Sequence, residues 1–360
     1  MTAVSDSAVV GAHLCGSVPL QSSDEVFRVV SEELGGHVKR IPDGETGERS
    51  GWAGWAAQVF YRIDGLEERH PFYKEISPRQ IGLADGRSPG DIRYPNLGYA
   101  DAALESYERF AQYKREGRIA PDVRFQVSMA TPVAVVSAVV VESEFATLEP
   151  GYEAAQMAEL RRILDGIPHS ELAIQWDVCI EVWFHEGWVK APFQPVEEGI
   201  ATRLARYAAA VPEDVELGFH FCYGDFKHAH LGQPADCRAC VDIFNQAAEL
   251  IDRPIEFIHV PVPVERDDVG YFAPLAELRL PSETELYLGV VHIRDGVEGA
   301  QRRIATARRH LQSFGIATEC GMGRRPPERG GTQDGTRELL QIHAAVAAPV
   351  RRHGGGDPWH

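Results

Sequence analysis

The sequence lacks the features that would place this protein in a membrane or on nucleic acid. No apolar run approaches the roughly 20 residues that span a bilayer. The N-terminal stretch MTAVSDSAVVGAHLCGS has neither the basic start nor the long apolar core of a signal peptide. Positive charge is also scarce, because 36 Lys and Arg stand against 53 Asp and Glu, a formal net charge of -17. This balance argues against non-specific binding to nucleic acid or anionic lipid. We therefore expect a cytoplasmic protein with neither a nucleic-acid nor a membrane partner.

Two other signals are missing. The sequence contains no short repeat, and no GxGxxG follows the first apolar run, which removes the main sign of a dinucleotide-binding sheet. The six cysteines of a cytoplasmic chain are expected to be reduced thiols and not a disulfide framework.

The chain does contain a series of short apolar, β-branched runs separated by longer amphipathic stretches. We predict eight strands, over 8–16, 38–44, 123–130, 172–180, 216–224, 255–262, 285–293 and 315–321. Strands that alternate with helices favour a parallel sheet. Eight such units in a chain of 360 residues predict an α/β fold of the (β/α)8 TIM-type barrel class, with an open doubly wound sheet as the alternative.

Apolar residues at three- and four-residue intervals predict helices over 24–35, 153–166, 197–211, 238–251 and 299–315. The segment from about 46 to 122 is too long for one helix and two loops, so we predict an elaborated insertion after the second strand, with 52–63 and 101–117 helical. Residues 1–350 would then form one barrel domain, followed by a tail over 351–360 that is expected to be disordered.

The barrel prediction also locates the active site. In such barrels the active residues lie at the carboxyl ends of the strands. The predicted strand ends are rich in polar and metal-binding side chains, at 15–17, 43–45, 177, 220–222, 259, 292–294 and 319–320.

A zinc site is the first interpretation of these residues. His220 and Cys222 share one face of a strand because side chains alternate along it. Cys320, at another strand end, would add a second sulfur. Zinc binds sulfur and imidazole nitrogen in a tetrahedral arrangement, and catalytic zinc sites leave one of the four positions open. The competing interpretation is that these cysteines are small buried hydrophobes.

A rival metal site lies at 237-CRAC-240, close to His228 and His230. A CxxC pair is compatible with zinc or with redox chemistry. No second CxxC completes a set, and Cys240 is expected in the first turn of a helix, so this pair is less suited to be the catalytic centre.

Several motifs at the strand ends resemble those of the cobalamin-independent methionine synthase superfamily, which includes the related uroporphyrinogen decarboxylase barrels. The motifs are 16-GSVP-19, 43-DGETGE-48, 130-ATPVA-134, 174-IQWDV-178, 220-HFC-222 and 319-ECG-321. In scale the chain is similar to epoxyalkane:coenzyme M transferase, a single-barrel relative. The resemblance implies that His220, Cys222 and Cys320 ligate zinc. It also implies that Ser17, Glu45 and Asp177 bind the substrate, the two carboxylates through an ammonium group.

The departures from this family bear on function. Its fourth zinc ligand, a glutamate, falls at or near His259, which either replaces it or leaves three protein ligands. The tryptophan of the folate platform has no counterpart after 130-ATPVA-134, and the histidine of the DxHS element is matched by Arg294. An ordinary methylfolate-dependent synthase is therefore not expected.

The chemistry that remains is alkyl transfer from a donor to a small-molecule thiol activated by zinc. His292 and Arg294, with His259 as a further candidate, would assist the leaving group as acids. An anionic thiol would require an arginine, and Arg324 and Arg325 are available, although both are expected in a solvated loop. The alternatives are a metal-free lyase or decarboxylase on the same barrel and a non-catalytic zinc- or thiol-binding protein. Carboxylates beside the metal ligands favour an enzyme.

Overall fold

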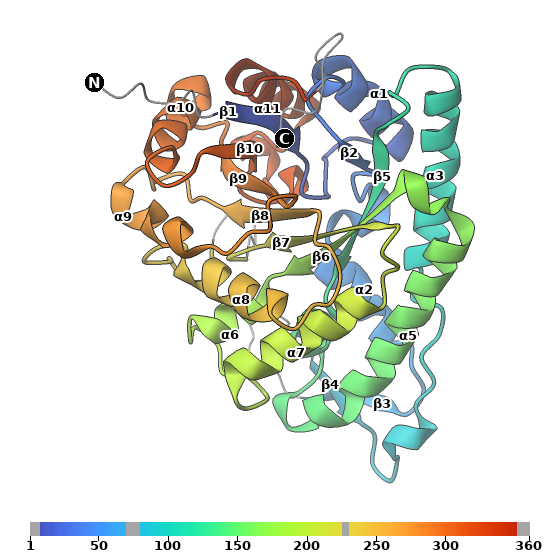
Figure 1. Cartoon of the computed structure of the whole chain (residues 1–360). Helices are drawn as coiled ribbons and strands as arrows, with labels where there is room; N and C mark the ends of the chain where they lie inside the picture. The colour runs from blue at the N-terminus through green and yellow to red at the C-terminus, as the bar shows by residue number, and fades with distance from the viewer. Residues whose placement is uncertain (1–7, 70–79, 225–229, 351–360) are drawn as a thin grey trace.

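An eight-stranded parallel sheet forms the centre of the protein (Figure 1), in a computed structural model that describes residues 8–69, 80–224 and 230–350. Its strands are β1 (Ala8–His13), β2 (Arg40–Pro42), β5 (Arg124–Ala130), β6 (Leu172–Val178), β7 (Glu216–Phe221), β8 (Phe257–Pro261), β9 (Glu285–Val291) and β10 (Ser313–Thr318). The order is β1-β10-β9-β8-β7-β6-β5-β2, and every pairing is parallel. All eight predicted strands are confirmed.

The sheet curls so that its two edges meet. An isolated parallel bridge joins Ala12 of β1 to Val38, and the Ala12 amide donates to the His37 carbonyl at 2.7 Å. Hydrogen bonds also cross the concave side: Gln175 Oε1 of β6 accepts from His13 Nε2 at 2.8 Å, and Gln175 Nε2 donates to the Cys15 carbonyl at 2.9 Å. This is the form of a TIM-type barrel.

Helices surround the sheet, as Figure 1 shows. They are α1 (Ser23–Leu34), α3 (Tyr99–Arg115), α4 (Pro132–Val139), α5 (Phe145–Gly166), α6 (Ile180–His185), α7 (Val196–Ala209), α8 (Arg238–Ala248), α9 (Val269–Phe272), α10 (Gly296–Ala307) and α11 (Gln333–Val346). None of the described helices is both long and apolar enough to cross a bilayer.

Helix α1 shows how the local sequence determines where a helix begins, which face it buries and where it ends. The Ser22 hydroxyl caps α1 by accepting from the Glu25 amide, and such a cap contributes about 1 kcal/mol. Val26, Phe27 and Val30 recur at three- and four-residue spacing and are buried against the barrel. The helix ends at Leu34, just before two glycines.

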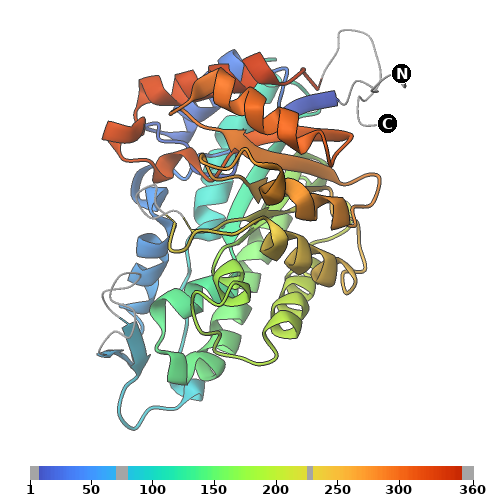
Figure 2. The same ribbon diagram turned by 90° about the vertical axis from the view of Figure 1, so that its left-hand side faces the viewer.

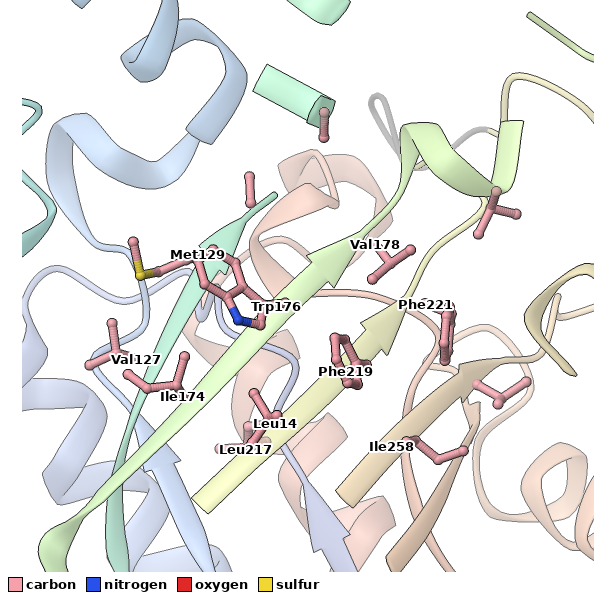
Figure 3. Close-up of a cluster of buried hydrophobic side chains, with 14 of the residues drawn as sticks. Leu14, Val127, Met129, Ile174, Trp176, Val178, Leu217, Phe219, Phe221 and Ile258 are labelled. Atoms are coloured by element: carbon pink, nitrogen blue, oxygen red, sulfur yellow. The ribbon is translucent and has the colours of Figure 1, made fainter. Parts of the chain in front are cut away.

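Side chains alternate along each strand, so one face carries apolar packing residues and the other carries the polar residues of the site. In β6 the side chains of Ile174, Trp176 and Val178 lie in the apolar layer between sheet and helices (Figure 3). Trp176 packs on Tyr207 of α7, with ring centroids 5.5 Å apart. The intervening Gln175 and Asp177 therefore face the inside of the barrel.

The segment between β2 and β5 holds α2 (Trp52–Phe60), β3 (Leu66–Arg69), β4 (Gln80–Leu83) and α3. Both helices predicted for this segment are confirmed. β3 and β4 form a small antiparallel sheet that was not predicted. They lie at the end of the molecule away from α10 and α11 (Figures 1 and 2). Residues 70–79 of this segment and the predicted tail 351–360 lie outside the described residues.

One predicted helix is too long. The interval 299–315 was predicted as helical throughout, but α10 ends at Ala307 and β10 begins at Ser313. The chain must turn back toward the sheet there, and the apolar residues after 307 belong to that turn and to β10.

Candidate active site

A cluster of imidazole and thiol groups lies where β7 and β10 end. The Sγ atoms of Cys222 and Cys320 are 3.4 Å apart, and Cys320 Sγ lies 3.7 Å from His220 Nε2. His220, Cys222 and Cys320 form one of two groups among the described residues that could hold a metal ion. The structure thus brings together the three side chains that the sequence predicts as zinc ligands, and their binding of a metal stays a prediction.

The spacing of these atoms suits a tetrahedral zinc ion. With Zn–S near 2.3 Å and Zn–N near 2.0–2.1 Å, two sulfurs would be about 3.8 Å apart and sulfur and nitrogen about 3.6 Å apart. The distances of 3.4 and 3.7 Å are each within about 0.4 Å of these values. Two sulfurs and one nitrogen also match the donor atoms that zinc prefers.

The backbone after β7 is shaped around Cys222. Gly224 has a φ of 81°, and its amide donates to Cys222 Sγ at 3.3 Å. A Cβ atom at Gly224 would lie 2.2 Å from the Trp183 ring, so only glycine fits.

The second group consists of Cys15, His220 and His259. His220 Nδ1 lies 2.7 Å from His259 Nδ1, and His259 Nε2 lies 3.1 Å from the Thr318 carbonyl oxygen. Burial lowers the pKa of His259 to about 3, against the opposing effect of the Thr318 and Phe221 carbonyls. Burial, with His259 as its neighbour, also lowers the pKa of His220, so both rings are neutral near pH 7.

Two carboxylates lie on the same side of the barrel. Glu45 follows β2 with a φ of 49°, a left-handed conformation that costs a non-glycine residue about 1–3 kcal/mol. Asp177, at the end of β6, accepts from Gln175 Nε2 at 2.8 Å. Burial, together with the nearby charge of Glu45, raises the pKa of Asp177 to about 8.

Arg324 joins this pair, contrary to the sequence prediction. It was expected in a solvated loop, but its side chain is only 14% exposed and Nη2 donates to Glu45 Oε2 at 3.1 Å. Nη1 donates to the Ser50 carbonyl at 3.1 Å. Burial raises the pKa of Glu45, while Arg324 opposes that rise. The carboxylate expected to bind an ammonium group therefore already faces a cation.

Ser17 lies next to the same loop. Its Oγ is buried and has no hydrogen-bond partner among the described residues. The Gly323 amide donates to the Ser17 carbonyl at 3.3 Å, and a Cβ atom at Gly321 would lie 2.2 Å from Ser17 Oγ. The hydroxyl is thus held against the turn that follows Cys320.

His292, at the end of β9, is buried beside Glu319. Its Nε2 donates to the Val262 carbonyl at 2.9 Å, and Nδ1 lies 3.8 Å from Glu319 Oε2. The other oxygen of Glu319 lies 2.9 Å from His230 Nε2. Sequence reasoning gave no role to Glu319 and placed His230 in the rival metal site.

Two predictions for the site need correction. Arg294 was predicted to be catalytic, but its side chain is 62% exposed and its guanidinium binds Glu265 in two places, so it points to solvent and not into the site. Arg325 was expected in a solvated loop and is buried.

Cys237 and Cys240, the rival metal site, lie in the packed interior of the protein. Cys237 and Cys240 are both fully buried, and neither belongs to a possible metal group among the described residues. Burial raises the pKa of Cys237 to about 12, which disfavours the thiolate. His228 lies outside the described residues.

Comparisons with known proteins identify the fold. The sequence matches no protein-family model and no curated protein. A solved structure from Listeria monocytogenes, described as a candidate vitamin-B12-independent methionine synthase, has a TM-score of 0.54 at 14% identity, over 91% of this chain and 87% of that one. A methyltransferase from Methanosarcina mazei has a TM-score of 0.53 at 14% identity, over 95% and 94% of the two chains. These two structures share the fold of this chain. The fold implied by the resemblance is therefore confirmed.

Proposed function

We propose that this protein is a zinc-dependent transferase that moves an alkyl group, methyl or similar, from a small donor to a small-molecule thiol. The observation that carries the proposal is the spacing of Cys222, Cys320 and His220, which suits zinc and leaves room for one more ligand. The shared fold with a candidate methionine synthase and a methyltransferase supports it. The proposal treats residues 1–350 as one barrel domain in which about 46–122 is an insertion.

His220, Cys222 and Cys320 would hold the zinc ion. When bound, zinc would lower the pKa of a thiol substrate and so supply a nucleophile near neutral pH. The reaction is then R–SH + R′–X → R–S–R′ + HX, in which an S–C bond forms, the C–X bond breaks, and the thiol proton leaves with X. With an epoxide donor, X is the ring oxygen, which stays attached to R′ and takes the proton as a hydroxyl group.

Side chains of this protein would place the thiol and deliver the proton. Ser17, Glu45 and Asp177, together with Arg324, would bind the polar end of the thiol. His292 is the candidate acid for the leaving group, because its Nδ1 lies 3.8 Å from Glu319 Oε2, a carboxylate that would stabilise the protonated ring. Arg294 has no part in this proposal.

A thiol screen tests the function. Purified protein with zinc would be incubated with amino-acid, neutral and anionic thiols and with methyl or epoxide donors, and loss of free thiol would be followed with the thioether product. We expect one thiol class to be alkylated by the wild type and by Cys240→Ser, and no alkylation by Cys222→Ser. Equal rates in wild type and Cys222→Ser would refute the proposal.

A further inference from the structure

The contact between His220 and His259 assigns the proton on each ring. A carbonyl oxygen can only accept a hydrogen bond, so the 3.1 Å contact with Thr318 requires a proton on His259 Nε2. A neutral imidazole has one donor and one acceptor nitrogen, so His259 Nδ1 then accepts.

His259 is well placed to remain neutral. Its side chain is fully buried, and none of the ion pairs among the described residues includes it. A charged imidazole without a counter-ion in such a place would be strongly disfavoured.

The donor in the 2.7 Å contact is therefore His220 Nδ1. If Nδ1 of His220 carries the proton, its Nε2 carries the lone pair, and Nε2 is the nitrogen that lies 3.7 Å from Cys320 Sγ. The two successive hydrogen bonds, from His259 to Thr318 and from His220 to His259, thus orient the Nε2 lone pair of His220 toward the two sulfurs.

The same geometry argues against His259 as a ligand. Two nitrogens that share a tetrahedral zinc lie about 3.3 Å apart, because each Zn–N bond is near 2.0–2.1 Å. The separation of 2.7 Å is shorter and is that of a hydrogen bond. Both ring nitrogens of His259 are already used, one by Thr318 and one by His220.

We infer that His259 is a positioning residue that fixes His220 in the Nδ1-protonated tautomer and does not ligate the metal. The inference rests on the proposed metal site and deepens it. In this chain the metal would keep three protein ligands, and the fourth position would belong to the substrate.

Two variants of His259 separate positioning from packing. Glutamine can donate to Thr318 and accept from His220, whereas leucine can do neither. We expect His259→Gln to keep zinc affinity within a few-fold and His259→Leu to lower it about 10- to 100-fold, the usual effect of losing such a partner. His343→Leu is the matched control, because His343 is equally buried and, among the described residues, its hydrogen bond is to the Leu339 carbonyl. It should leave the affinity unchanged.

Nitrogen NMR of the imidazoles in the wild type, after treatment with a chelator, gives a readout that needs no metal and no activity. We expect His220 with a proton on Nδ1 and none on Nε2. The opposite tautomer would overturn the inference, as would two imidazole ligands in zinc X-ray absorption or unchanged affinity in a folded His259→Leu. If His259→Leu does not fold, the NMR result and His259→Gln decide. If the wild type binds no zinc, the proposed function fails, while the tautomer of His220 still tests this inference by itself.

Discussion

Replacing Asp177 with asparagine should change how the stability of the protein depends on pH. The carboxyl group lies at the end of β6, partly buried, with a pKa raised by burial and by Glu45 from 3.8 to about 8. Between these values the folded protein holds a proton on Asp177 that the unfolded chain has lost. The free energy of unfolding therefore falls as pH rises from about 4 to about 8.

The magnitude follows from the pKa difference. About 4 pH units at about 1.4 kcal/mol per unit give an upper limit of about 6 kcal/mol, and the real value is smaller because water reaches the group. Asparagine keeps the oxygen that accepts from Gln175 Nε2 but does not titrate. Asp177→Asn should thus gain stability over the wild type as pH rises.

Urea unfolding at pH 5, 6, 7 and 8 would measure this. The difference in unfolding free energy between Asp177→Asn and the wild type should grow by up to about 1.4 kcal/mol per pH unit. The matched control is Asp252→Asn, the same substitution at an exposed aspartate, which gives the baseline for replacing a carboxyl group with an amide. A pH-independent difference for Asp177→Asn would refute the reasoning.

Three further predictions concern single side chains. Arg294→Ala should leave turnover within about twofold and unfolding free energy within about 1 kcal/mol, because an exposed pair with Glu265 contributes little; a large loss of turnover would restore Arg294 to the site. Trp176→Ala should lower the unfolding free energy by about 3–5 kcal/mol in urea titrations, because the buried ring leaves a cavity; a loss under about 1 kcal/mol would contradict its place in the core. Arg324→Met should lower kcat/KM for an amino-acid thiol by about tenfold, because it removes a group that binds the polar end of the thiol and that keeps the pKa of Glu45 from rising further; an unchanged kcat/KM would show that Arg324 has no part in thiol binding.

Strand periodicity predicted the sheet and the ligand face of the barrel well. His220 lies in β7 and Cys222 directly follows that strand, and the two-residue spacing predicts that both side chains share the inner face. Cys320 was predicted as a further ligand because the strand before it ends at the same rim of the barrel as β7. The short strands β3 and β4 were missed, since LEER and QIGL are only four residues each and are too short to show a reliable period.

The partners of the site residues could not be predicted, because they depend on contacts between distant segments. Arg324 looks like a solvated loop residue in sequence, but it pairs with Glu45, which lies 279 positions earlier. The role of His259 depends on the pairing of β7 with β8, which sets its ring beside that of His220. Neither contact leaves a local signal in the sequence.

The zinc content of the purified protein tests the central claim most directly. Elemental analysis would compare the wild type with Cys222→Ser, and with Cys240→Ser as the control at a buried cysteine outside the cluster. We predict about one zinc per chain in the wild type and in Cys240→Ser, and little zinc in a folded Cys222→Ser. Stoichiometric zinc retained in Cys222→Ser, or lost from Cys240→Ser alone, would contradict the assignment of the metal site.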